Sequence, residues 1–208
     1  MTKLILTRHG ETSWNLEGRV QGAKDSPLTQ KGILQARQLA YRLRSEGIKY
    51  LYSSDMPRAH ATAEEIRRVL NILEVRLTPA MRELCFGEWE GQVWWELRKN
   101  FPEIFTIWDK GPHLVKIPGA ESMNQVTERA WAFVQEIIGK HKGETVCIVT
   151  HGMTLQLLVK KIMGFAVGDW ESVPWQHNTA LNIFEVNQAG DFQTLTVADH
   201  THLCELGT

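Results

Sequence analysis

Two mostly apolar runs, far apart in the chain, end in the same dipeptide. Residues 3–8 lead into His9-Gly10, and residues 145–150 lead into His151-Gly152. Apolar runs of this length that stop at a glycine are typical of buried strands in a parallel sheet. Ligands bind beyond the carboxyl ends of such strands, so the two histidines are predicted to face one another across a single pocket.

The rest of the pattern alternates between helix and strand. Helices are expected over residues 29–47, 54–70, 121–140 and 154–163, and strands over residues 48–53 and 74–78. Residues 181–186 and 192–197 alternate apolar and polar positions around Gly190-Asp191, which predicts an antiparallel hairpin. The alternation predicts an α/β fold: a three-layer α/β/α sandwich whose central sheet is mostly parallel with an antiparallel element.

Residues 83–120 break this alternation. They hold glycine, proline and tryptophan in short helical pieces, which predicts a small helical cap inserted into one domain that spans residues 1–208. Helical spacing places Trp94 on an apolar face and sends Trp95 elsewhere. The cap tryptophans either pack a small core or form an apolar wall beside a bound ligand, and the sequence leaves both interpretations open. They are Trp89, Trp94, Trp95 and Trp108.

The composition excludes several classes of function. The 208 residues carry a formal net charge of −1, so no broad basic surface and no nucleic-acid binding are expected. No apolar run approaches the roughly 20 residues of a membrane span, and the first strand begins too early for a signal peptide. Three scattered cysteines without a CxxC motif fit a reducing compartment. We therefore expect a cytoplasmic protein without a membrane partner.

Candidate anion-binding residues follow the predicted strand ends. Arg8 and His9 leave the first strand together, and a guanidinium beside an imidazole suits binding of and attack on an anionic centre. Arg58 lies in the first turn of a predicted helix, where the helix dipole disfavours a cation by about 0.3–1 kcal/mol. An arginine there makes sense if an anion occupies the helix N-terminus. Glu83 precedes a glycine-bearing loop, but the residues alone do not distinguish it from two other glutamates of that loop.

Further motifs occur in order along the chain. Arg8-His9-Gly10-Glu11-Thr12 is followed by Trp14-Asn15, by Gln21-Gly22 and by Asp25-x-Pro27-Leu28-Thr29. Next come Ser54-Asp55 with Arg58-Ala59, Glu83 with Phe86-Gly87-x-Trp89-x-Gly91, and finally Thr150-His151-Gly152. Each motif is weak by itself. The joint pattern spans essentially the whole chain and resembles the histidine phosphatase superfamily, the phosphoglycerate mutase-like fold.

The resemblance implies a role for each of these residues. In this family the first histidine attacks phosphorus, so His9 would be the nucleophile and Glu83 the general acid and base. Arg8, Arg58 and His151 would assist catalysis, and the mechanism implies no metal and no cofactor. The implied phosphate-binding set is Arg8, Asn15, Gln21, Gly22, Arg58, His151 and Gly152. The two arginines lower the pKa of His9 and a bound dianion raises it; the sequence does not show which effect is larger.

The cap bears on the choice between hydrolase and mutase. Mutases of this family carry a basic and aromatic stretch after the acid glutamate and paired arginines in a longer cap. Here Leu84, Cys85 and Phe86 follow Glu83, and the cap has no arginine pair. A second phosphate would be poorly clamped, so we favour a phosphomonoesterase acting on small phosphorylated metabolites. The residues after Cys85 are similar to those of the broad-specificity and α-ribazole phosphatase branch.

Two alternatives stay open. One is a 2,3-bisphosphoglycerate-dependent phosphoglycerate mutase, and the other is a non-catalytic protein that binds a phosphorylated ligand. A homodimer is compatible with the sequence, which does not set the oligomeric state.

Overall fold

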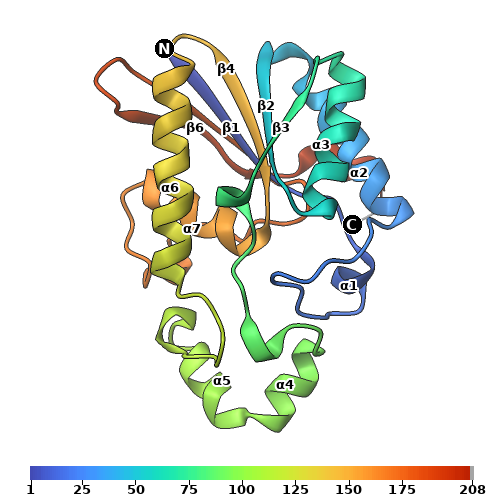
Figure 1. The fold of residues 1–208 in the computed structure, drawn as a ribbon, viewed down its shortest axis with the longest axis vertical. Helices are drawn as coiled ribbons and strands as arrows, with labels where there is room; N and C mark the ends of the chain where they lie inside the picture. The colour runs from blue at the N-terminus through green and yellow to red at the C-terminus, as the bar shows by residue number, and fades with distance from the viewer. Residues whose placement is uncertain (207–208) are drawn as a thin grey trace.

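A mixed sheet forms the centre of the molecule (Figure 1). The computed structural model describes residues 1–206, and within them six strands follow the order β3-β2-β4-β1-β5-β6. The strands are β1 (Thr2–Arg8), β2 (Ile48–Ser54), β3 (Val75–Thr78), β4 (Thr145–Thr150), β5 (Leu181–Val186) and β6 (Phe192–Asp199). β1 to β4 run parallel to one another, whereas β5 pairs antiparallel with both β1 and β6. The predicted sheet with its antiparallel hairpin is confirmed.

Helices cover both faces of this sheet (Figure 1). α2 (Gln30–Arg42) and α3 (Pro57–Leu70) pack on one face, and α6 (Met123–Lys140) and α7 (Gly152–Ile162) pack on the other. The three layers of the predicted sandwich are confirmed. Within residues 1–206, no helix is long and apolar enough to cross a membrane.

β1 shows why its sequence reads as a continuous apolar run. Leu4 and Leu6 pack into the core beneath α6 and α7, and Ile5 packs into the core beneath α2 and α3. Successive side chains of a strand point to opposite faces, so a strand covered on both sides needs apolar residues at every position. All three side chains are fully buried.

The helix ends follow their capping residues, with small corrections to the predicted bounds. Thr29 caps α2 by accepting a hydrogen bond from Gly32 N, but α2 ends at Arg42 and only a 3-10 turn continues it. α3 begins at Pro57, because the preceding serines belong to β2. α7 begins at Gly152, two residues before the expected start. A single turn, α1 (Ser13–Leu16), follows β1.

The cap lies between β3 and α6, at one end of the molecule (Figure 1). It contains α4 (Trp94–Asn100) and α5 (Pro102–Trp108), and a bridge between Phe86 and Ala120 closes its base. As helical spacing predicts, Trp95 points away from the apolar face and is 63% exposed.

Candidate active site

The two strand-end histidines meet, as predicted. β1 and β4 stay paired up to Arg8 and Thr150, and His9 N donates to Thr150 O at 3.0 Å. His9 and His151 follow directly, and their rings lie edge to face with centroids 5.2 Å apart. The parallel register therefore delivers two buried imidazoles to one place.

His9 is held in a form that can attack an electrophile. Its Nδ1 lies 2.7 Å from the carbonyl oxygen of Gly10. A carbonyl only accepts hydrogen bonds, so Nδ1 carries the ring proton and Nε2 keeps a free electron pair. Burial, followed by the charges of Arg58 and Arg8, holds the pKa of His9 well below its ordinary value of 6.5. The imidazole of the free protein is therefore neutral near neutral pH.

Arg58 is a buried cation at the start of α3. Its Nη1 donates to Asp25 Oδ1 and to Lys24 O, both at 2.8 Å, and its Nη2 donates to Gly22 O at 2.9 Å. The Arg58 side chain is 1% exposed, and a buried charge needs partners of this kind. The loop that contains the motif residues Gly22 and Asp25 thus fixes the guanidinium at this position.

Arg8 lies beside His9 at the end of β1. Its Nη1 donates to Gln176 O at 2.9 Å, and its guanidinium lies 6.0 Å from the ring centroid of Trp175. Burial lowers the pKa of Arg8 to about 10. The guanidinium therefore stays charged at neutral pH, and the site holds two cations beside a neutral imidazole.

Three buried nitrogens of this cluster have no hydrogen-bond partner within residues 1–206. They are Arg8 Nε, Arg58 Nε and His151 Nδ1. The other ring nitrogen of His151 lies 2.8 Å from Ser54 Oγ. Buried polar groups are nearly always paired in folded proteins. Phosphoryl oxygens accept hydrogen bonds from guanidinium groups, so the two arginine nitrogens suit such an anion.

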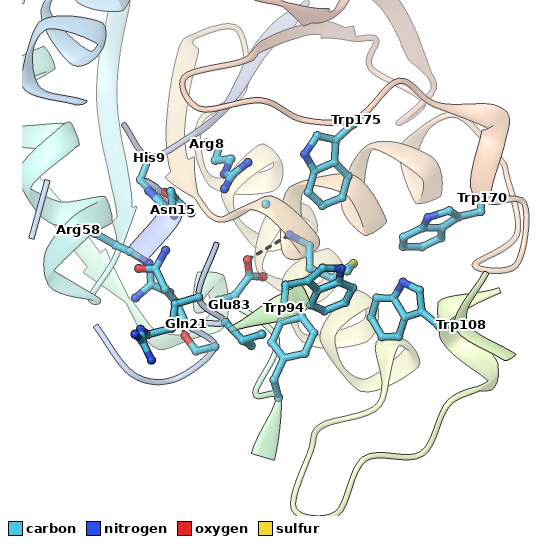
Figure 2. A pocket seen from close by; sticks show the side chains of 16 residues that line it. Arg8, His9, Asn15, Gln21, Arg58, Glu83, Trp94, Trp108, Trp170 and Trp175 are labelled. Atoms are coloured by element: carbon cyan, nitrogen blue, oxygen red, sulfur yellow. Dashed lines mark hydrogen bonds between the residues drawn. The ribbon is translucent and has the colours of Figure 1, made fainter. Parts of the chain in front are cut away.

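Glu83 sits at the N-terminus of α7. Its carboxylate accepts hydrogen bonds from Leu84 N at 2.9 Å, Met153 N at 3.1 Å and Thr154 N at 3.0 Å, and from Thr154 Oγ1 at 3.2 Å. Figure 2 shows the Glu83 side chain between the arginines and the aromatic side chains. A helix N-terminus favours a negative charge, so this position holds the carboxylate firmly while leaving it on the cavity wall.

The structure separates Glu83 from the other glutamates of its loop. Glu90 Oε1 accepts from Ala23 N at 2.8 Å and from Phe86 N at 2.9 Å, and so ties two loops together. Glu88 is exposed. Of the three, only Glu83 lines the cavity that His9 lines.

A cavity of about 300 Å³ connects these groups (Figure 2). Its polar end is lined by Arg8, His9, Asn15, Gln21, Gly22, Arg58, Glu83 and Gly152. His151 does not line the cavity; it lies against His9 and is fully buried. All residues of the predicted site therefore lie in this cavity or directly beside it.

The opposite end of the cavity is aromatic. Trp94 and Trp108 reach it from the cap, and Trp170 reaches it from the segment after α7, whereas Trp175 of the same segment lies beside Arg8 (Figure 2). Trp89 is instead buried in the cap. Trp94 and Trp108 pack against the same core as Trp89 and also line the cavity, so packing is confirmed for all three, and the role of Trp94 and Trp108 as a wall beside a ligand stays a prediction.

Several residues of the cavity were not identified from the sequence. Trp170 begins a single 3-10 turn and Trp175 lies in irregular backbone, and neither stretch is long enough for a periodicity that indicates what a side chain contacts. Arg19 also lines the cavity, and its Nε pairs with Glu17 at 3.0 Å. In the sequence, only its position between Gly18 and the Gln21-Gly22 motif could have indicated that Arg19 belongs to the site. Within residues 1–206, no three His, Cys, Asp or Glu side chains converge so that they could hold a metal ion.

Comparisons with known proteins agree with this geometry. The family model described as histidine phosphatase superfamily (branch 1) matches residues 4–200. This chain belongs to the histidine phosphatase superfamily. It is 36% identical over 208 residues to phosphoglycerate mutase-like protein 4 of Arabidopsis thaliana, covering 99% of this chain and 88% of that protein. It is 37% identical over 164 residues to phosphoserine phosphatase 1 of Hydrogenobacter thermophilus, covering 79% of this chain and 77% of that protein.

Solved structures of the superfamily share the fold. YhfR of Bacillus stearothermophilus matches with a TM-score of 0.91 and 38% identity, covering 98% of this chain and 100% of that chain. A variant of phosphoserine phosphatase from Entamoeba histolytica, in complex with phosphoserine, matches with a TM-score of 0.82 and 27% identity, covering 98% of this chain and 100% of that chain. The superfamily predicted from the motifs is confirmed, and the α-ribazole phosphatase branch stays a prediction.

Proposed function

We propose that this protein is a phosphomonoesterase that hydrolyses small phosphorylated metabolites through a phosphohistidine on His9. The observation that carries the proposal is that the cavity has a polar, cationic end and an aromatic end. One end gathers His9 with Arg8 and Arg58, the other end is aromatic, and Glu83 lies between them (Figure 2). A phosphate ester bound along this cavity has its phosphorus beside the nucleophile and its leaving group beside a carboxyl group.

The first step transfers the phosphoryl group to the protein. His9 Nε2 attacks phosphorus, and the bond from phosphorus to the ester oxygen breaks. Arg8 and Arg58 balance the charge on the phosphoryl oxygens, as cationic clamps do in phosphoryl transfer. Protonated Glu83 gives its proton to the leaving oxygen, which departs as an alcohol.

The second step returns the protein to its starting state. A water molecule attacks the phosphohistidine, and the carboxylate of Glu83 takes a proton from this water. The bond from phosphorus to Nε2 breaks, inorganic phosphate leaves, and His9 is again neutral. Glu83 thus acts first as an acid and then as a base.

The mutase alternative requires a second phosphate at the leaving-group end. Among residues 1–206, the cap contributes Glu83, Phe86, Trp94 and Trp108 to the cavity lining, and no cation. Its one arginine, Arg98, pairs with Asp109 at 2.7 Å on the surface. Outside the cap, Arg19 also lines the cavity, but its Nε already pairs with Glu17 at 3.0 Å. This arrangement favours hydrolysis, although the name of the Arabidopsis relative keeps the mutase as the second candidate.

The aromatic end also narrows the class of substrate. Trp94, Trp108 and Trp170 at one end of a small cavity favour a leaving group that is flat and apolar, because aromatic side chains stack on such groups. α-Ribazole phosphate carries a benzimidazole ring and fits this description. Phosphoserine, on which the Hydrogenobacter relative acts according to its name, has a small polar leaving group that would use less of this wall.

The test is phosphate release from p-nitrophenyl phosphate and a panel of metabolites by the wild type and by His9→Ala. We expect the variant to lose activity by at least about a thousandfold, because the nucleophile acts as a unit with its partners. His60→Ala, at a partly exposed histidine of α3, is the matched control and should behave like the wild type. Wild-type turnover by His9→Ala would end the proposal. Interconversion of 2- and 3-phosphoglycerate that outpaces phosphate release would favour the mutase, and phosphate binding without any turnover would favour the non-catalytic alternative.

A further inference from the structure

The segment Gln176–Thr179, between α7 and β5, crosses the carboxyl end of β1. Arg8 Nη1 donates to Gln176 O at 2.9 Å, and Thr179 N donates to Arg8 O at 3.2 Å. Thr179 has a φ of +57°, a left-handed conformation that a β-branched residue adopts only where its surroundings hold it. The segment is therefore fixed against the strand end that carries His9.

Asn178 contacts two residues of the site with one side chain. Its Nδ2 donates to His9 O at 3.0 Å and to Asn15 Oδ1 at 3.2 Å. A primary amide has two N–H donors, so both are used. Asn178 thus links the backbone of His9 to the side chain of Asn15, although Asn15 and Asn178 are 163 residues apart in the sequence.

Asn178 and the backbone of Thr12 together hold the orientation of the Asn15 amide. Asn15 Oδ1 also accepts a hydrogen bond from Thr12 N at 3.2 Å. Its oxygen therefore has two donors, one for each lone pair. An amide held by its oxygen turns its NH₂ group to the opposite side, and Asn15 lines the cavity beside His9 and Arg58 (Figure 2).

We propose that Asn178 is a positioning residue that holds the Asn15 amide with its NH₂ group facing the phosphoryl group. The inference rests on the proposed function, in that Asn15 contacts a phosphorylated ligand. The competing explanation is that Asn178 only braces its own loop. The two explanations differ once Asn15 is shortened, because a positioning residue then has nothing left to position, whereas a brace still matters.

A double-mutant cycle on Asn15→Ala and Asn178→Ala separates the explanations. The measurements are the Kd of inorganic phosphate by calorimetry and kcat/KM with p-nitrophenyl phosphate. Asn178→Ala is expected to raise the Kd of phosphate and to lower kcat/KM, each about tenfold, which is the loss typical of one hydrogen bond to a charged group. The double variant should have the same Kd and the same kcat/KM as Asn15→Ala alone. Losses that multiply in the double variant would overturn the inference, and so would an Asn178→Ala protein that binds phosphate like the wild type.

Two further variants keep the test decisive. Asn178→Leu keeps nearly the same side-chain volume, removes both donors and adds no charge beside the bound anion, so it should weaken phosphate binding as much, and it takes the place of Asn178→Ala in the cycle if that variant does not fold. Asn187→Ala removes an amide from the exposed hairpin between β5 and β6 and should leave both measurements unchanged. If the wild type binds phosphate but hydrolyses no monoester, the proposed function fails, and the phosphate titrations still decide the role of Asn178.

Discussion

Glu83→Gln tests whether Glu83 supplies the proton to the leaving group while His9 alone attacks phosphorus. The variant keeps the shape of the side chain but cannot donate a carboxylic proton. General acid catalysis contributes about a hundredfold to ten-thousandfold, or about 3–5 kcal/mol of barrier. An alkyl phosphate such as phosphoserine needs that proton, whereas p-nitrophenolate leaves without one. We therefore expect kcat/KM to fall by that factor for phosphoserine and by less than about tenfold for p-nitrophenyl phosphate.

The contacts of Glu83 set a second, separate effect of the same substitution. Oε1 accepts from Leu84 N, Thr154 N and Thr154 Oγ1, and Oε2 accepts from Met153 N. A glutamine can keep its oxygen on the first three donors, which turns its NH₂ group toward Met153 N. One unpaired buried N–H costs about 1–3 kcal/mol. This cost should lower the free energy of unfolding measured by urea denaturation. Any loss of kcat/KM that it causes should be equal for the two substrates.

The assay compares both substrates with stopped-flow measurements of p-nitrophenol release. kcat/KM for p-nitrophenyl phosphate reports the first transfer, but kcat also includes the attack of water, for which Glu83 is the base. The variant should therefore release a rapid burst of p-nitrophenol followed by slow turnover. Glu88→Gln, at an exposed glutamate of the same loop, is the control. Equal losses of kcat/KM on both substrates, without a burst, would refute the acid and base role.

Two other predictions concern the aromatic wall and the buried histidines. Trp170→Leu should raise KM about tenfold for 1-naphthyl phosphate and less than twofold for phosphoserine, because aromatic stacking is worth about 0.5–1.5 kcal/mol beyond burial; Trp95→Leu, at a tryptophan that is 63% exposed, should change neither. The free energy of unfolding should fall as the pH drops below about 6.5, by up to about 2.7 kcal/mol per pH unit for two histidines. His9 and His151 have lowered pKa values in the folded state, chiefly through burial, so below 6.5 the unfolded chain binds protons that the folded chain does not. Urea denaturation between pH 7.5 and 5.5 measures this slope.

Each of these two predictions has its own contradicting result. Equal rises in KM for both substrates would mean that Trp170 supports the fold rather than the leaving group. Burial also lowers the pKa of His202, to about 4, and the pKa values of His141 and His177, so part of the slope should remain when His9 and His151 are both replaced by asparagine. A pH-independent free energy of unfolding, or a slope that this double replacement does not reduce, would show that other groups control the acid sensitivity.

The sequence predicted the core of the site because local rules apply there. His9 and His151 end apolar runs, and parallel strands bring their carboxyl ends together, so pairing of β1 with β4 follows. Arg58 was identified by its unfavourable place in a helix first turn, and it is 1% exposed with partners from the preceding loop. In each case a short stretch of sequence carries the physical constraint.

The remaining residues depend on contacts that no short stretch of sequence carries. Trp170 lies in a single 3-10 turn and Trp175 in irregular backbone, and only the tertiary fold brings both into the cavity that Trp94 and Trp108 line. Asn178 is one of many polar loop residues until the fold places its amide on the backbone of His9. Glu83 was chosen over its neighbours from the family pattern. The structure gives the physical difference, because only Glu83 accepts hydrogen bonds from the N-terminus of α7 and lines the cavity.

The proposed mechanism requires a covalent phosphoryl group on His9. The direct measurement is rapid mixing with p-nitrophenyl phosphate, quenching in alkali, and mass spectrometry of the peptide that contains His9, with Glu83→Gln included because its second step is slow. We expect an acid-labile phosphoryl group on His9 in both proteins and none in His9→Ala. Label on another residue, or full turnover with no phosphorylated His9 at any time, would contradict it.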